Sequence, residues 1–172
     1  MYYGDEIGMT DALIPAAEVQ DPAEKNEPGK GMGRDPERTP MQWDSSRFAG
    51  FTRGTPWLRL GADHATVNVA TLSGQSDSVL GLYRTLIRMR NGTAALNSGR
   101  VEGVAGNGQI LRYERVDDGQ RFTILLNFNQ SDEVAPIAAG HIVVSTHMDR
   151  SSEALESRVS LRPFEGMVIR ND

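Results

Sequence analysis

The sequence predicts an α+β chain made of a long loop region, one amphipathic helix and a small antiparallel β-sandwich. Prolines and glycines interrupt residues 10–75 so often that no regular period survives there. Residues 77–91 repeat apolar side chains with helical spacing. From about residue 100 onward, apolar and polar side chains alternate with a period of two. The chain therefore runs from loop to helix to sheet.

The chain opens with "MYYGDEIGM", in which aromatic residues are followed at once by the carboxylate pair Asp5-Glu6. A domain usually begins with a few loose polar residues. We therefore expect that other residues preceded this segment, and that it lies in a strand or in the loop after one. Neighbouring side chains of a strand face opposite ways, so only one of the two carboxylates would point into a site. The alternative is a solvated turn, in which the pair has no function.

Residues 10–75 are predicted to be a functional loop that rests on other parts of the protein. So long a stretch without regular structure is unusual in a compact domain. It also carries too many large apolar side chains for a solvated linker. We expect these side chains to serve packing more than ligand contact. They are Met32, Met41, Trp43, Phe48, Phe51, Trp57 and Leu58.

Residues 77–91, "DSVLGLYRTLIRMRN", are predicted to form a helix with one apolar face. Ser76 or Asp77 is expected to cap its N-terminus. Asn91-Gly92 offers the left-handed residue that ends many helices. The spacing of the apolar face is set by Val79, Tyr83, Leu86, Ile87 and Arg90.

The last third of the chain predicts short strands joined by turns. The segments "GQILRYERV" and "RFTILLNFN" flank Asp117-Asp118-Gly119-Gln120, which is typical of a β-hairpin. "HIVVST" is a third strand, and "SRVSLRP" and "GMVIRN" are a closing pair around Pro163. Such strands predict an antiparallel sandwich. The aromatic residues expected on its inward face are Tyr113, Phe122, Phe128 and Phe164.

Composition excludes several classes of function. A net charge of −5 and a pI near 5.2 argue against a nucleic-acid partner. No segment approaches the ~20 apolar residues that a membrane span needs, so no membrane association is expected. The start of the chain has no signal-peptide pattern, and we expect a cytoplasmic location. There is no cysteine, and His64, His141 and His147 lack metal-ligand spacing, so we expect no metal and no cofactor.

The segment "GRDPERTPMQWD" combines fixed geometry with charge. Arg34 and Arg38 flank Asp35 and Glu37, and two prolines restrict the backbone. An arginine presents a planar fork of donors that can grip a carboxylate or a pair of hydroxyls. Trp43 adds a flat apolar face suited to a sugar ring. The residues alone leave two alternatives equally open, namely a sugar-binding loop and a surface ion-pair cluster of little energetic value.

The order of several motifs resembles the α-glucosidases of the α-amylase superfamily of glycoside hydrolases. "YYGDEIGM" resembles their eighth barrel strand, and "LYRTLIRMR" resembles their eighth barrel helix. "GRDPERTPMQWD", "AGFT" and "PW" resemble the long loop between these two elements. "LRPFEGMVI" resembles the close of their C-terminal sandwich. The resemblance is to oligo-1,6-glucosidase-like members and covers nearly the whole chain.

This resemblance implies an α+β fragment of a larger enzyme. Residues 1–96 would be the last strand, the substrate loop and the last helix of a (β/α)₈ barrel, and residues 97–172 an antiparallel β-sandwich domain. The barrel segment that contains strands one to seven would be missing. Residues 1 to about 70 are then expected to have few partners within the chain.

The resemblance also implies a retaining mechanism, in which one carboxylate attacks the anomeric carbon and a carboxylic acid protonates the leaving oxygen. In the family these groups come from barrel strands four, five and seven, upstream of this chain, so no catalytic residue is assigned here. The substrate-binding residues implied are Arg34, which would reach the terminal glucose, Asp35, which would orient an arginine, and Arg38, which would brace the loop. The parent enzyme would act on α-glucosides, and the chain alone is expected to be inactive. The alternative is a stand-alone, non-catalytic sandwich that binds carbohydrate or protein.

Overall fold

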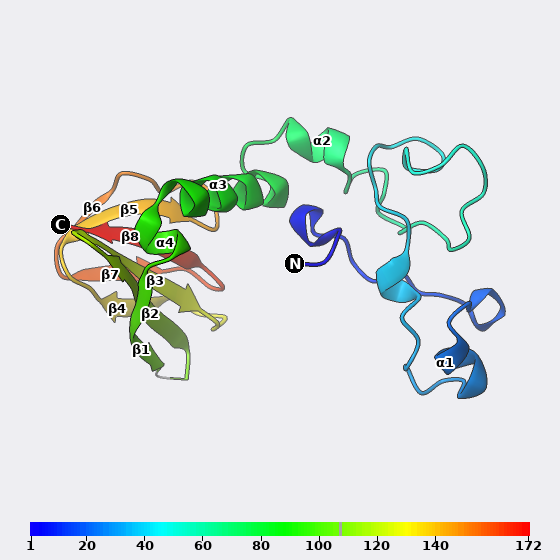
Figure 1. The fold of residues 1–172 in the computed structure, drawn as a ribbon, viewed down its shortest axis with the longest axis horizontal. Coiled ribbons are helices and arrows are strands. Elements are labelled where there is room, and N and C mark those ends of the chain that lie inside the picture. Colours follow the sequence, from blue (N-terminus) through cyan, green and yellow to red (C-terminus); the bar gives the residue numbers. More distant parts are fainter. Residues whose placement is uncertain (107) are drawn as a thin grey trace. The chain divides into compact units, whose positions relative to one another are not determined.

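The computed structural model describes residues 1–106 and 108–172, and it divides the chain into two compact units, Met1–Tyr83 and Arg84–Asp172 (Figure 1). The division falls inside helix α3 (Val79–Gly92). The family resemblance implies a domain boundary after residue 96, and that domain assignment stays a prediction.

The first unit consists mainly of loops. Its regular elements are η1 (Asp5–Ile7), η2 (Ala16–Glu18), α1 (Pro22–Asn26), η3 (Pro36–Arg38), α2 (Val69–Ser73) and the start of α3. No strand forms in residues 1–99, so the opening segment, expected to be a barrel strand, is a turn and a short 3₁₀ helix in this structure. The physical reason is that a strand needs hydrogen-bonding neighbours, which this unit does not supply.

The loops of the first unit nevertheless hold one another in place. Gln42 is fully buried, and its side-chain amide donates to the backbone oxygen of Val67. The backbone N–H of Val69 returns a hydrogen bond to Gln42 at 3.0 Å. A small core lies beside this contact, formed by Ile7, Met41 and Leu80 with Met9, Val69 and Leu72 packed against it. The expectation that residues 1 to about 70 have few partners is therefore wrong, because polar side chains satisfy the backbone of the loops.

Helix α3 confirms the helix predicted over residues 77–91. Its N-terminal cap is Ser78, not Ser76 or Asp77, since the Ser78 hydroxyl accepts the N–H of Gly81 at 3.1 Å. The helix ends at Gly92, which does not adopt the left-handed conformation that was expected.

The second unit is built on antiparallel strands (Figure 1). Six strands form one sheet in the order β1-β2-β3-β8-β5-β6, and β4 pairs with β7 in a second sheet. The hairpin predicted around Gly119 is confirmed, because Asp117 pairs with Gln120 and Gly119 has a φ of 71°. The elements of this unit after α3 are α4 (Ala94–Asn97), β1 (Arg100–Gly106), β2 (Ile110–Asp117), β3 (Gln120–Asn127), β4 (Glu133–Pro136), β5 (Gly140–Ser145), β6 (Ala154–Leu155), β7 (Arg158–Leu161) and β8 (Gly166–Asn171).

The strands on either side of Pro163 were expected to pair with each other, and this is wrong. Strand β7 pairs with β4, whereas β8 lies between β3 and β5 in the large sheet. The main core lies where the two sheets meet. Its members are Ile110, Leu125, Ala135, Ile137, Ile142, Leu155, Val159, Leu161, Met167 and Ile169.

A second cluster packs α4 against strand β3, through Ala95, Leu96, Phe122 and Ile124. Phe122 is buried as expected, and Tyr113 packs against the same cluster. Phe128 and Phe164, however, are 64% and 62% exposed, which corrects their expected inward position. Both lie just outside a strand, where the alternation of faces no longer applies.

Candidate functional site

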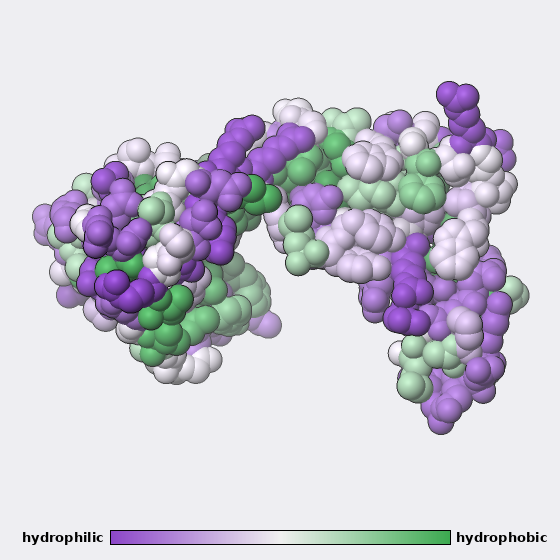
Figure 2. Space-filling view, in the orientation of Figure 1, coloured by the Kyte–Doolittle hydropathy of each residue, from purple (hydrophilic) through white to green (hydrophobic). Residues whose placement is uncertain are grey.

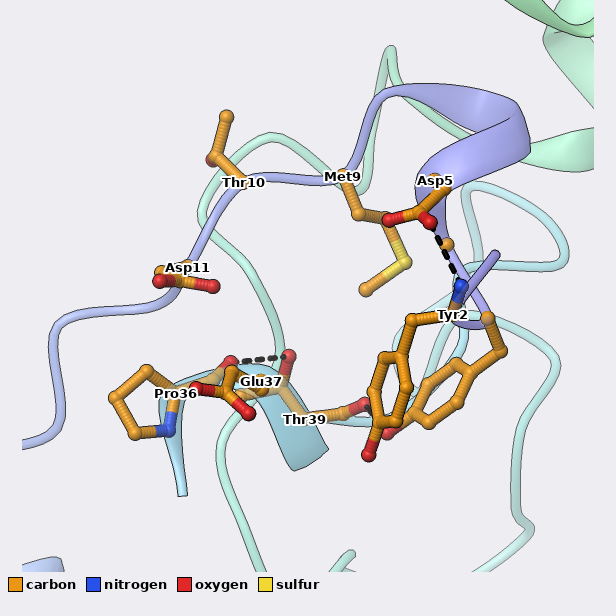
Figure 3. A pocket seen from close by; sticks show the side chains of 10 residues that line it. Tyr2, Asp5, Met9, Thr10, Asp11, Pro36, Glu37 and Thr39 are labelled. Carbon is orange, nitrogen blue, oxygen red and sulfur yellow. Dashed lines mark hydrogen bonds between the residues drawn. The ribbon is translucent and has the colours of Figure 1, made fainter. Parts of the chain in front are cut away.

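A hollow of about 340 Å³ in the first unit joins the start of the chain to the loop around η3 (Figure 3). Its walls come from residues 2–11 and residues 36–39, which are distant in sequence. The lining residues are Tyr2, Tyr3, Gly4, Asp5, Met9, Thr10, Asp11, Pro36, Glu37 and Thr39.

The first wall is a tight turn that depends on glycine. Gly4 has a φ of 93°, and a Cβ placed on it would lie 2.9 Å from the Sδ of Met9. Two carboxylates close the turn, since Asp5 accepts the N–H of Tyr2 at 2.7 Å and Glu6 accepts the N–H of Gly4 at 2.9 Å. The motif "YYGDE" thus forms a turn in which its own carboxylates accept two of its backbone N–H groups.

The two walls are joined by a hydrogen bond from the Tyr3 hydroxyl to the backbone oxygen of Thr39 at 2.9 Å. Thr39 is buried, and its own hydroxyl donates to the backbone oxygen of Pro36 at 3.4 Å (Figure 3). Burial raises the pKa of Tyr3, and the neighbouring Tyr2 raises it further, while the charge of Arg38 acts in the opposite direction. Tyr3 therefore keeps its proton at neutral pH and can serve as a donor.

Three carboxylates, those of Asp5, Asp11 and Glu37, lie around this hollow (Figure 3). Carboxylate oxygens beside aromatic rings suit a ligand with many hydroxyl groups. Glu6 lines a different hollow of about 300 Å³, together with Tyr3, Met41, Trp43 and Phe51. The expectation that only one member of the Asp5-Glu6 pair points into a site assumed a strand, whereas the pair lies in a 3₁₀ turn and each of the two residues lines a hollow.

Arg34 does not line the hollow of Figure 3. Its Nε donates to Oδ2 of Asp21 at 3.3 Å, and its backbone N–H donates to the same oxygen at 3.2 Å. The side chain is 59% exposed, and its two terminal nitrogens donate no hydrogen bond to any residue that the structure describes. Arg34 therefore presents an anchored fork with its outer donors free.

Asp35 is buried, and its carboxylate accepts hydrogen bonds from backbone N–H groups and none from an arginine. Its Oδ2 accepts the N–H groups of Gln20 at 2.5 Å and Asp21 at 2.9 Å. The contact with an arginine that was expected of Asp35 is made by Asp21 in this structure. Asp21 was not among the predicted site residues, although its place before Pro22 at the start of a helix is a recognisable N-cap signal.

Arg38 ends η3, where its backbone N–H donates to the oxygen of Asp35 at 3.1 Å. Its half-buried side chain forms no hydrogen bond or ion pair with a described residue, and its charge acts on Tyr3. Glu37 lines the hollow and makes no contact with either arginine among the described interactions. The ion-pair cluster considered for Arg34 to Arg38 is therefore not formed.

Glu24 of α1 organises the loop before Arg34, a role that was not predicted from the sequence. Its Oε1 accepts the N–H of Gly29 at 2.7 Å, and its Oε2 accepts those of Met32 at 3.0 Å and Gly33 at 3.1 Å. A Cβ on Gly33 would lie 2.7 Å from the Cβ of Glu24, so the loop closes tightly on this side chain. The N–H of Gly29 is the main cause that lowers the pKa of Glu24.

Hydrophilic residues cover the part of the first unit around α1 (Figure 2). Within the residues that the structure describes, no group of three or more His, Asp or Glu side chains could hold a metal ion. Over the same residues, no helix combines the length and apolar character needed to traverse a bilayer.

The chain is similar to a known protein family and to enzymes of known activity. Residues 1–99 match the family described as alpha amylase, catalytic domain. The oligo-1,6-glucosidase of Parageobacillus thermoglucosidasius is 30% identical over 99% of this chain, and the trehalose-6-phosphate hydrolase of Escherichia coli is 31% identical over 97% of it. In each case the match spans 34% of the relative.

Solved structures give the same result. A variant of the trehalulose synthase MutB superposes with a TM-score of 0.88 at 27% identity, over 99% of this chain and 35% of that one. The enzyme from Pseudomonas mesoacidophila gives 0.86 at 25% identity, with the same coverage. The chain thus spans about a third of the length of the relatives it matches, in their C-terminal region. Because the family match covers more than half of the chain, the chain belongs to the alpha-amylase family.

Proposed function

We propose that this chain is the C-terminal part of a retaining α-glucosidase that hydrolyses terminal α-glucosidic bonds in oligosaccharides or disaccharides. The observation that carries the proposal is the match of residues 1–99 to the catalytic domain of the family. Relatives named oligo-1,6-glucosidase, aligned over nearly the whole chain, support the same substrate class.

In this proposal the chain binds sugar and does not break the bond. The nucleophile and the general acid of a retaining glycosidase stand roughly 5 Å apart, and by motif they belong to barrel strands that this chain does not contain. Arg34 donates from its free terminal nitrogens to hydroxyls of the terminal glucose. Asp35 holds the loop, and Arg38 braces it beside Tyr3.

The hollow of Figure 3 is proposed to form part of the wall of the sugar pocket. Its carboxylates accept hydrogen bonds from hydroxyl groups, and its paired rings, with Tyr2 and Tyr3 centroids 4.9 Å apart, offer an apolar face. The hollow is closed by the Tyr3–Thr39 hydrogen bond, so its shape exists before a ligand binds.

The test uses a grafted enzyme, in which this chain replaces the matched third of the oligo-1,6-glucosidase of Parageobacillus thermoglucosidasius. The 172-residue chain alone should not release chromophore from a chromogenic α-glucoside, whereas the grafted enzyme should. A grafted enzyme that folds, judged by circular dichroism and gel filtration, but never turns over would contradict the proposal. Sustained turnover by the chain alone would contradict it as well.

A second candidate is a stand-alone module that binds carbohydrate without catalysis. The exposed rings of Phe128 and Phe164 favour it, because exposed aromatic side chains suit sugar recognition. The backbone N–H of Phe164 donates to the oxygen of Asn129, so the two rings lie on neighbouring loops. Calorimetry of the chain with maltose and isomaltose separates the candidates. Saturable heat that Phe164→Ala abolishes and Arg34→Ala leaves unchanged would favour the binding module, whereas heat that depends on Arg34 and not on Phe164 would favour the first proposal.

A further inference from the structure

Hydrogen bonds in both directions join two short segments of the first unit, residues 20–21 and 34–35. The Asp35 carboxylate accepts the backbone N–H groups of Gln20 and Asp21. The Asp21 carboxylate accepts the backbone N–H and the Nε of Arg34 in return. Because each segment holds the other through a buried carboxylate, the position of Arg34 is fixed by the chain itself.

The two carboxylate oxygens of Asp21 accept hydrogen bonds from different residues. Oδ1 accepts the N–H of Ala23 at 2.8 Å and caps α1, while Oδ2 serves only Arg34. The side chain of Asp21 is 1% exposed, so solvent does not compete for either oxygen. The N–H of Ala23, followed by the groups of Arg34, lowers the pKa of Asp21, which keeps the carboxylate ionised at neutral pH.

We infer that Asp21 is a positioning residue, which orients the Arg34 fork toward the sugar; this inference rests on the proposed function. A guanidinium held at Nε keeps its plane fixed and leaves both terminal nitrogens to donate outward. An arginine ordered in advance loses less rotamer freedom when a ligand binds. Asp21 therefore acts on substrate affinity through Arg34 and does not itself touch the sugar.

Glu24, in the first turn of α1, supports the same loop. Its three backbone hydrogen bonds shape residues 29–33, the segment that leads directly into Arg34. A helix of five residues thus carries two carboxylate anchors, its cap and Glu24, on which the loop is built.

The first test follows the Nε–H of Arg34 by ¹⁵N NMR in the 172-residue chain, with Arg34→Lys used to assign the signal. Asp21→Asn keeps an oxygen for the cap, since asparagine caps helices as well as aspartate does, but loses the acceptor for Arg34. We expect the Nε–H to exchange with solvent about tenfold faster in Asp21→Asn, with the Ala23 amide unchanged. The matched control is Glu27→Gln, which removes one charge from an exposed pair on the same loop. An unchanged Arg34 signal in Asp21→Asn would overturn the inference.

The second test measures kcat and KM of the grafted enzyme for isomaltose. Asp21→Asn should raise KM about threefold to tenfold with kcat nearly unchanged, and Glu27→Gln should change neither. Combined with Arg34→Ala, Asp21→Asn should add nothing, because its effect passes through the guanidinium. If Arg34→Ala leaves KM unchanged, the proposed role of Arg34 fails. If Arg34→Ala raises KM while Asp21→Asn does not, the positioning role of Asp21 fails.

Discussion

The two units of this chain hold their backbones by different means. In the sheet unit, ladders of backbone hydrogen bonds enclose a core of ten buried apolar residues. In the loop unit the core has only three buried members, and carboxylate and amide side chains satisfy the backbone in place of strands. The comparison indicates that a long loop can be shaped by a few local polar contacts, without a sheet to supply its backbone partners.

The largest effect should come from the core of the sheet. Leu125 is fully buried in β3, and Leu125→Ala should lower the free energy of unfolding by about 2–5 kcal/mol through lost burial and a cavity. Urea unfolding followed by circular dichroism measures this. Leu13→Ala, at a residue that is 87% exposed in the loop unit, is the control and should change stability by less than about 0.5 kcal/mol. Equal effects of the two substitutions would mean that the units are not held as described.

Acid should disturb the loop unit before the sheet unit. The pKa values of Asp21, Glu24 and Asp44 are lowered, mainly by the N–H of Ala23, the N–H of Gly29 and the hydroxyl of Ser46, respectively. A lowered pKa in the folded state stabilises the fold above the unfolded value, near 4, and this stability is lost as the pH falls through the folded value.

Both tryptophans lie in the loop unit, so their fluorescence reports on that unit alone. We expect the fluorescence to change at a higher pH than the β-sheet signal in circular dichroism. The sheet unit also contains carboxylates with lowered pKa values, and the hydrogen bond from Arg162 lowers the pKa of Asp149 strongly. Its larger apolar core, however, does not titrate, so the sheet should outlast the loops. Coincident transitions of the two signals would contradict this difference between the units.

A smaller, local effect is expected from Glu24→Gln. The substitution keeps one oxygen but replaces the acceptor that serves Met32 and Gly33. Amide exchange in residues 29–33 should become about tenfold faster, while the amide of Ile142 in β5 stays protected. Hydrogen exchange measured by NMR or mass spectrometry gives both values. Unchanged exchange in residues 29–33 would show that the loop is held by something other than Glu24.

Much of the sheet unit follows from the sequence, because period-two alternation and a turn at Asp118-Gly119 are local signals. The pairing of β7 with β4 could not be predicted, since it joins strands that are distant in sequence and depends on which sheet each strand enters. The exposed Phe164 was missed because a turn residue with a φ of 55° no longer follows the strand pattern.

In the loop unit, two residues of the loop motif could be predicted from the sequence, but their hydrogen-bond partners could not. The sequence pointed to Arg34 and Asp35 from their motif, yet it could not show that Asp21 would hold the arginine, thirteen positions away. Glu24 carries no periodic signal, and its role appears only when residues 29–33 fold back onto it. Short-range contacts of this kind depend on the path of the backbone, which loop sequences specify weakly.

The most direct test of the sugar-binding account is the kcat/KM of the grafted enzyme for isomaltose after Arg34→Ala, with Arg100→Ala, at an exposed arginine of β1, as the control. Hydrogen bonds from a charged donor predict a loss of about tenfold to a hundredfold for Arg34→Ala and none for Arg100→Ala. Equal kcat/KM values for Arg34→Ala and the unsubstituted grafted enzyme would contradict the account.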